Sequence, residues 1–297
     1  MKQMKKSLQF IVLNCAVSWV VSGMAILLGV REAKGLIYAV FAGVYMFLPA
    51  VCAIILQTIH KEKPFRNLFI SFKLNWWFLV AGFLPIICTF LALGINLLFP
   101  NVYFLTSHEG LLLYMAEEEV ENAIQHLSKY QPVVFLLIQI VNALIYGYTI
   151  NAIFAFGEEF GWRGYLVKAL REIKLLTVSL IIGVVWGLWH FPLILIGHNY
   201  PQHPIAGIGM MVIFCVLLTP VMIYIVIKSK SVITAAIFHG TLNSIGGISI
   251  LFLTGGNDLT NGMTGLAGFL SLLLINLVFY IYDKHITKEN ILTSVIL

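Results

Sequence analysis

Charged side chains are scarce in this sequence. They make up 10% of its 297 residues, whereas hydrophobic residues make up 60% and the mean hydropathy is +0.95. A soluble domain carries about 25% charged residues, so the composition excludes an ordinary soluble domain. The sequence also lacks the alternation of apolar and polar residues that a membrane β-barrel shows. We therefore predict an all-α polytopic membrane protein.

Cysteine is also scarce, and none of the four cysteines forms a Cys-x-x-Cys pair. Cys15, Cys52, Cys88 and Cys215 all lie in apolar stretches. Their spacing supports neither a disulfide framework nor a thiolate metal site. A cleavable signal peptide is not indicated, because the first apolar run is long and no small-x-small cleavage site follows it. That run is predicted to be an uncleaved first span.

Long apolar runs are the main feature that the sequence does have, and eight of them are long enough to cross a bilayer. If these spans alternate in direction, 15 of the 18 basic residues fall in the connections on one side. This bias predicts that both termini are cytoplasmic. The net charge of +5 thus reflects topology and indicates no nucleic-acid partner. The predicted spans are residues 8–30, 35–59, 76–99, 133–157, 175–197, 205–227, 231–253 and 264–282.

Membrane-embedded acids and histidines occur only in the second half of the chain. Residues 1–131 are therefore predicted to be a scaffold of three transmembrane helices and an acidic outside connection. Residues 132–297 are predicted to be a catalytic core of five helices. Within residues 100–131, apolar residues recur at helical spacing beside five glutamates, which predicts a short amphipathic surface helix. The first half repeats none of the polar motifs, which argues against an inverted-repeat transporter.

Two carboxylates and an arginine stand beside some of the most apolar sequence in the chain, at Glu158, Glu159 and Arg163. A charge inside a bilayer costs roughly 2.5–3.5 kcal/mol on insertion scales, so such residues mark functional sites. Glu159 and Arg163 are four residues apart and can pair on one helix face. Glu158 lies on an adjacent face, where it is left free to act as a general base. The alternative is that both glutamates cap a helix at the membrane surface.

Two of the eight histidines, His190 and His239, lie within apolar runs. Pro192 follows His190 and removes a helical hydrogen bond, which predicts a bend at this point. His239 and Asn243 are four residues apart, so they share one helix face. They could polarise a carbonyl oxygen or help to hold a metal. Either histidine could instead bridge two helices by a hydrogen bond.

Small residues recur at four-residue spacing beside these motifs. The patterns are Gly157-x-x-x-Gly161 in the fourth span and Gly183-x-x-x-Gly187 in the fifth. Such patterns let another helix approach closely. We therefore expect the fourth and fifth spans to pack backbone to backbone beside the site.

Together, the three polar motifs resemble the CPBP family of intramembrane proteases, which comprises CAAX proteases and bacteriocin-processing enzymes and is also called the Abi family. The resemblance covers residues 142–256. The second family motif often has phenylalanine where this chain has Trp186. The matching motifs are Glu158-Glu159-x-x-x-Arg163, Trp186-x-x-x-His190 and His239-x-x-x-Asn243.

The resemblance implies an eight-helix intramembrane endopeptidase whose cavity opens toward the cytoplasm. It implies that Glu158 activates a water with help from His190. Glu159 and Arg163 would hold the site together, and His239 with Asn243 would form the oxyanion hole. Family members are often labelled metalloproteases, and a mechanism without a metal has also been argued.

The cofactor is therefore left open between Zn²⁺ and none. If a metal is bound, its candidate ligands are Glu158, His190 and His239, because two histidines and a carboxylate leave an open position on zinc. The implied partners are a peptide or lipidated-protein substrate and the lipid bilayer, here a bacterial cell membrane.

Two alternative functions remain. One is a non-catalytic bacteriocin-immunity or peptide-binding protein of the same fold, and the other is a proton-coupled transporter with Glu158 as its relay. The sequence specifies neither the substrate nor the oligomeric state.

Overall fold

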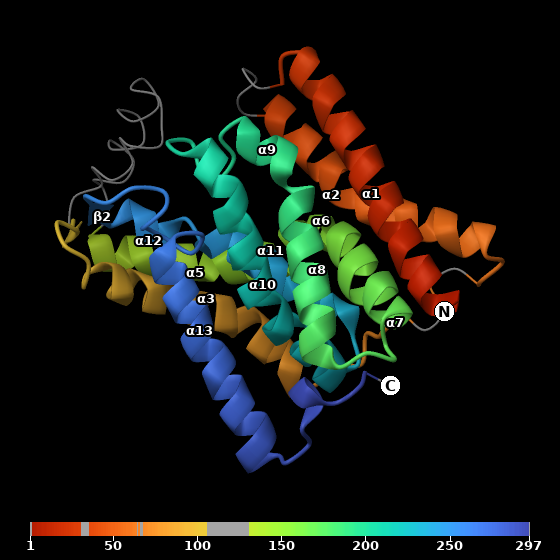
Figure 1. Cartoon of the computed structure of the whole chain (residues 1–297). Coiled ribbons are helices and arrows are strands. Elements are labelled where there is room, and N and C mark those ends of the chain that lie inside the picture. Colours follow the sequence, from red (N-terminus) through yellow and green to blue (C-terminus); the bar gives the residue numbers. More distant parts are fainter. Residues whose placement is uncertain (1, 31–35, 64, 66–67, 106–130, 297) are drawn as a thin grey trace.

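The computed structural model of the protein describes residues 2–30, 36–63, 65, 68–105 and 131–296. The described part is mostly helical and includes one short antiparallel ribbon, in agreement with the predicted polytopic all-α class (Figure 1). The predicted amphipathic helix of the acidic connection falls almost entirely on residues 106–130, outside the described residues. The elements are α1 Lys2–Leu27, α2 Leu36–Ile59, α3 Trp76–Asn96, β1 Tyr103–Phe104, α5 Pro132–Tyr148, α6 Ile150–Glu159, the π-helix η2 Phe160–Leu166, α7 Val167–Ala169, α8 Leu175–Trp189, α9 Phe191–Leu195, α10 Pro204–Ser229, α11 Val232–Ile245, α12 Ile248–Leu251, β2 Leu253–Thr254, α13 Leu266–Ile281, the π-helix η3 Tyr282–Ile286 and the 3₁₀-helix η4 Ile291–Thr293.

Five helices in the described part are long and apolar enough to cross a membrane, and a bent helix pair would make a sixth. The predicted number of eight spans is therefore not confirmed. The fifth and seventh predicted spans correspond to α8, with 15 residues, and α11, with 14 residues. At 1.5 Å per residue these helices are about 21–22 Å long, shorter than a hydrocarbon core of about 30 Å. The spanning helices are Met4–Leu27, Val40–Ile59, Trp76–Asn96, Pro204–Ser229 and Leu266–Ile286.

The long apolar segment before Arg163 is broken. The stretch from Pro132 to Leu170 is too long for one ordinary span, which predicts a break, a strong tilt or a projection into the cytoplasm, and the structure shows a break. Helices α5 and α6 meet at Thr149, and the pair is bent by 50°. Beyond Glu159 the chain continues as the π-helix η2, which carries Arg163. π-helical turns are rare within α-helices, and they are frequently found at functional sites. The two carboxylates thus lie where one helix type changes into another.

Gly157 in α6 and Gly161 in η2 bring this segment into direct contact with α2. A Cβ on Gly157 would lie 2.7 Å from the carbonyl oxygen of Met46, and one on Gly161 would lie 2.6 Å from the Cβ of Pro49. From the opposite direction, a Cβ on Gly240 of α11 would lie 2.7 Å from a backbone nitrogen of α6. Helix α6 is therefore packed between α2 and α11, and any side chain at these glycines would push the helices apart.

Gly183 and Gly187 bring α8 into contact with α10. A Cβ on either glycine would lie 2.5 Å from a Cα atom of α10, that of Val216 or that of Val212. The expectation that the fourth and fifth spans pack together through their glycines is therefore wrong. The spacing predicted close approach correctly, but a pattern on one helix carries no information about which helix approaches it.

Candidate active site

A cavity of about 570 Å³ contains most of the polar residues that the sequence motifs predicted. Its walls come from α2, α6, α8, α10 and α11 and from the connections around residues 197–201 and 263–264. Glu159 and Arg163 do not line this cavity and are fully buried. The structure therefore separates the six predicted site residues into four that face the cavity and two that support them. The four that face it are Glu158, His190, His239 and Asn243.

Glu158 is held by the indole of Trp186. The Nε1–H of Trp186 donates to Oε2 of Glu158 at 2.8 Å, and the glutamate is only 3% exposed. This bond fixes one carboxylate oxygen and leaves the other for a water or substrate in the cavity. The sequence motif included Trp186 only as an aromatic residue, and this hydrogen bond was not predicted. The sequence contained one indication of this bond, namely tryptophan in place of phenylalanine, because a buried indole N–H needs a hydrogen-bond partner.

Glu159 and Arg163 form the predicted pair, and two further side chains join it. Arg163 donates from Nη1 to Oε1 of Glu159 at 3.2 Å and from Nη2 to Oγ1 of Thr219 at 3.1 Å. Nδ1 of His239 lies 2.9 Å from the same glutamate oxygen. The guanidinium also stacks over Trp186, with its central carbon 4.0 Å from the ring centroid. Glu159 thus links α6 to α11, and Arg163 links η2 to α10.

The hydrogen bonds of the two histidines determine which ring nitrogen each can offer to the cavity. Nδ1 of His190 lies 2.8 Å from the carbonyl oxygen of Trp186, which can only accept, so this nitrogen carries the proton. A neutral His190 then presents Nε2 as an acceptor. His239 directs Nδ1 at the Glu159 carboxylate, which also only accepts. Nε2 of His239 can therefore donate only when the ring is doubly protonated.

The first two helices contribute directly to the position of His190, although the sequence suggested only a scaffold there. The hydroxyl of Tyr45 donates to the carbonyl of Trp189 at 2.8 Å, and Nε1 of Trp189 donates to Ser18 at 2.7 Å. The rings of Trp189 and His190 are in edge contact, with centroids 4.8 Å apart. Tyr45 also lines the cavity, as does Tyr38 from the same helix. No sequence signal distinguished these residues from others in the apolar spans.

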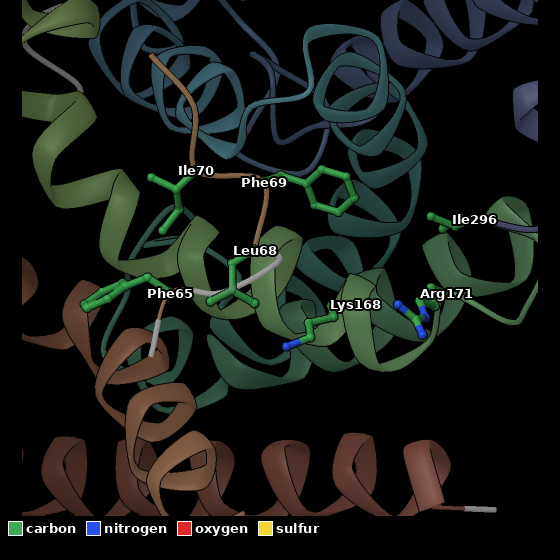
Figure 2. A pocket seen from close by; sticks show the side chains of 7 residues that line it. All are labelled: Phe65, Leu68, Phe69, Ile70, Lys168, Arg171 and Ile296. Atoms are coloured by element: carbon green, nitrogen blue, oxygen red, sulfur yellow. The ribbon is translucent and has the colours of Figure 1, made fainter. Parts of the chain in front are cut away.

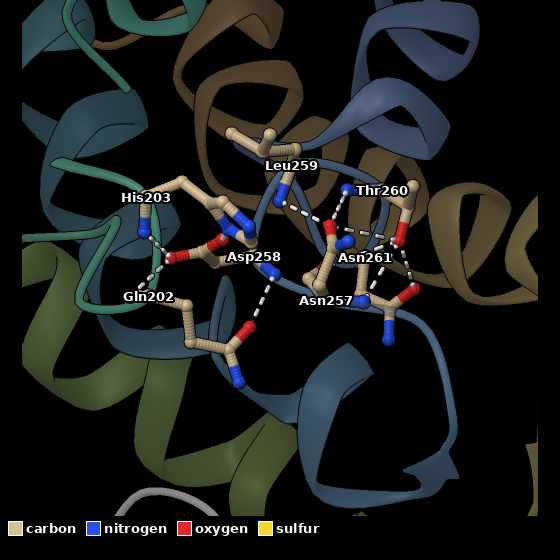
Figure 3. Close-up of polar contacts among 7 residues, drawn as sticks. All are labelled: Gln202, His203, Asn257, Asp258, Leu259, Thr260 and Asn261. Carbon is tan, nitrogen blue, oxygen red and sulfur yellow. Dashed lines mark hydrogen bonds and ion pairs between the residues drawn. The ribbon is translucent and has the colours of Figure 1, made fainter. Parts of the chain in front are cut away.

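Polar contacts fix the two connections at one end of the cavity (Figure 3). Asp258 accepts from the backbone nitrogens of Gln202 and His203 at 2.7 and 3.1 Å, and its other oxygen lies 2.5 Å from Nδ1 of His203. The connection before α10 is therefore tied to the connection before α13. Met263 and Thr264, which follow in the second connection, line the cavity. This cluster holds the end wall of the cavity in place.

The cavity has exposed lining residues at the end that these connections form. Asn199 and Asn243 are among them. Lys174 and Lys228 lie at the opposite ends of α8 and α10. Under the predicted orientation the basic ends are cytoplasmic. The predicted cytoplasmic opening of the cavity and the predicted cytoplasmic termini both stay predictions.

The candidate metal ligands do not form a metal site. In the part of the chain that the structure describes, no group of three or more His, Cys, Asp or Glu residues is arranged to hold a metal ion. Glu158, His190 and His239 line the same cavity, and Nε2 is the nitrogen that each histidine could offer to a metal because Nδ1 binds a protein oxygen. Among the described residues, however, these three side chains are not grouped closely enough to act together as metal ligands. The residues present do not fit a bound Zn²⁺, and no step of the proposed reaction is derived through one.

The segment that carries the site matches a known family. Residues 140–245 match the family model described as type II CAAX prenyl endopeptidase Rce1-like, and they include all six predicted site residues. The resemblance to CAAX proteases is confirmed. A CAAX prenyl protease 2 from Methanococcus maripaludis is 37% identical over 93 residues, which cover 29% of this chain and 34% of that protein. The chain therefore matches about a third of the length of this CAAX protease.

Proposed function

We propose that the protein is an intramembrane endopeptidase that hydrolyses a peptide bond in a membrane-associated peptide or in a CAAX-like, lipidated tail. The observation that carries this proposal is the convergence of a carboxylate, two imidazoles and an amide on one cavity. Apolar side chains, including Met211, Phe214 and Leu218, line much of the remaining surface, which suits a substrate with an apolar end. The likeness to CAAX endopeptidases supports the same reaction class.

Glu158 is the proposed general base. Its free oxygen accepts a proton from a water, while Nε2 of His190 accepts a second hydrogen bond from the same water and orients it. The water oxygen attacks the carbonyl carbon of the substrate. Glu158 then delivers its proton to the leaving nitrogen, so the carbon–nitrogen bond breaks and an acid and an amine result. Trp186 keeps the base in position through its bond to Oε2.

His239 and Asn243 are the proposed donors to the carbonyl oxygen as it becomes negative. Because Nδ1 of His239 is bound to Glu159, donation from Nε2 requires the imidazolium form. Glu159 stabilises that cation by its charge. Glu159 would therefore support the oxyanion donor as well as neutralise Arg163.

Cleavage of defined peptides tests this function. Purified protein in nanodiscs is incubated with membrane-associated peptides that do or do not carry a lipidated cysteine, and the products are detected by mass spectrometry. We expect the wild type to cleave these peptides. The cleavage rate of Glu158→Gln should be lower by a factor of more than about 100, because general base catalysis contributes about 10²–10⁴-fold. Glu172→Gln is the matched control, since Glu172 is exposed and does not line the cavity. Equal rates for Glu158→Gln and the wild type would refute the proposed base.

A non-catalytic peptide-binding protein, such as a bacteriocin-immunity factor, could use the same apolar cavity. The observation that favours it is that two of the hydrogen bonds of this pair, from Arg163 to Thr219 and from His239 to Glu159, also link separate helices and would serve a purely structural role. The same peptides distinguish the two functions. Binding without cleavage by the wild type, and unchanged binding by Glu158→Gln, would support the non-catalytic protein.

A further inference from the structure

A second cavity, of about 350 Å³, lies away from the candidate active site, at the end of the molecule that contains α7. Figure 2 shows its two cationic side chains on residues 168–171 and three apolar side chains on residues 68–70 across from them. The cavity therefore combines an apolar wall with a cationic one. Its lining residues are Phe65, Leu68, Phe69, Ile70, Lys168, Arg171 and Ile296.

The cationic wall keeps a net positive charge after the neighbouring acid is counted. Glu62 binds Lys168 at 2.9 Å and also binds Lys6, so one carboxylate is shared by two ammonium groups. Partial burial raises the pKa of Glu62, but the hydrogen bonds from Lys6 and Lys168 outweigh burial and lower the pKa below its ordinary value. Arg171 is exposed, and it forms no ion pair with any residue that the structure describes. Its guanidinium is thus the group best placed to receive an anion.

The apolar wall is held in an unusual backbone conformation. Phe65 and Phe69 have φ angles of 64° and 56°, in the left-handed region that bulky residues rarely adopt. The carbonyl of Phe69 accepts a hydrogen bond from the nitrogen of Val232 at 2.6 Å, which fixes this segment to the start of α11. Strained residues persist only where the surrounding structure holds them, and they are found often at ligand sites. The part of the wall around Phe69 is therefore held in place by α11.

The cavity lies at the basic ends of the helices, where the headgroups of a surrounding bilayer are expected. Lys6 lies near the start of α1, and Lys63 and Lys174 lie in adjoining connections, in agreement with the charge bias that the positive-inside rule describes. Anionic lipids are attracted to clusters of basic residues next to spanning helices. Arginine matches the geometry of a phosphate group because its planar guanidinium offers two parallel donors.

We propose that this cavity binds the phosphate group of an anionic amphiphile. Arg171 is the main contact to the phosphate, and Lys168 contributes a second positive charge. Leu68, Phe69 and Ile296 contact the apolar part of the ligand. Residues 168–171 follow η2 directly, so a bound amphiphile would also hold the end of the segment that carries Arg163.

Native mass spectrometry of the full-length protein in detergent tests this site. The protein is titrated separately with phosphatidylglycerol and with phosphatidylcholine that has the same acyl chains. We expect tighter binding of phosphatidylglycerol, and about tenfold weaker binding of it by Arg171→Gln, since one hydrogen bond to a charged group contributes about one factor of ten. Arg171→Lys should recover part of the loss. Lys73→Gln is the control, because Lys73 is an exposed basic residue near this end that does not line the cavity.

Three results would overturn the proposal: equal binding of the two lipids, wild-type affinity in Arg171→Gln, or an equal loss in Lys73→Gln. Inorganic phosphate at millimolar concentration separates the two sources of the ligand group. Displacement of phosphatidylglycerol by phosphate supports a site for the free anion, and retention of the lipid supports a site for the amphiphile. These measurements record binding and not cleavage, so their outcome does not depend on the proposed peptidase activity.

Discussion

Replacing Glu159 by glutamine would remove the negative charge that faces Arg163 inside the protein. Both side chains are fully buried, and the carboxylate also accepts a hydrogen bond from His239 at 2.9 Å. Glutamine keeps the shape and one acceptor oxygen of the original side chain. It leaves Arg163 as a buried cation without its ion-pair partner, in contact with the neutral glutamine oxygen, with Thr219 and with the face of an indole.

The expected cost follows from these contacts. Removing one partner of a buried ion pair costs about 3–5 kcal/mol. Because Arg163 keeps its bond to Thr219 and its aromatic contact, we expect the lower end of this range, about 3 kcal/mol. The matched variant is Glu158→Gln, in which the lost charge faces the cavity and is bound by Trp186. There we expect a loss of about 1 kcal/mol, the difference between a hydrogen bond to a charged acceptor and one to a neutral acceptor.

The assay compares unfolding and cleavage for both variants in the same detergent. Glu159→Gln should lower the free energy of unfolding by about 3 kcal/mol and the Tm by about 6 °C or more. Glu158→Gln should keep a Tm close to that of the wild type and lose peptide cleavage. A wild-type Tm for Glu159→Gln, or equal destabilisation of the two variants, would refute the division into a supporting and a reacting carboxylate.

Three further changes test individual contacts. Trp186→Phe keeps an aromatic ring but removes the hydrogen-bond donor to Glu158. The kcat for a cleaved peptide should therefore fall about tenfold, with KM little changed. An unchanged kcat would mean that other groups position the base. Gly161→Ala should lower the free energy of unfolding by about 1–3 kcal/mol, because the new Cβ would overlap the backbone of α2. Gly23→Ala is the control, because a Cβ at Gly23 meets open space and should not lower stability. Equal melting curves for the two variants would contradict this packing. The pKa of Glu62 is lowered in the folded state, so its contribution to stability is present above the ordinary pKa of 4.5 and is lost as pH falls through the lower folded pKa. When Tm is measured at decreasing pH, Glu62→Gln should therefore lose less stability than the wild type. Parallel losses of Tm in the two proteins would exclude this linkage.

Local geometry explains which features could be predicted from the sequence. Glu159 and Arg163 pair because residues four apart on a helix are neighbours, and this needs no knowledge of the fold. The helix ends beside His190 because Pro192 lacks an N–H group. The length of the segment from Pro132 to Leu170 predicted a break, a strong tilt or a projection into the cytoplasm, and the position of the observed break at Thr149 was not predicted.

Features that depend on two distant segments could not be predicted in this way. The four-residue spacing of Gly183 and Gly187 predicted a close neighbour, but the neighbour is α10 and not the fourth span. Helix α11 ends at Ile245, whereas the apolar run continues beyond it, so hydropathy alone did not give the length of this helix. The hydrogen bond from Trp186 to Glu158 depends on the relative position of α8 and α6, which hydropathy alone does not give.

The close contact between α6 and α2 makes the segment that matches the family dependent on a helix outside that segment. Gly157 and Gly161 leave no room for added volume, and the facing backbone is that of Met46 to Pro49. A fragment limited to residues 140–245 would therefore lack one side of the support for its carboxylates. Substitutions at this contact would be tolerated only when the opposite helix changes as well. The two helices are thus expected to coevolve as a pair, and a chimera that exchanges one without the other should fail to assemble.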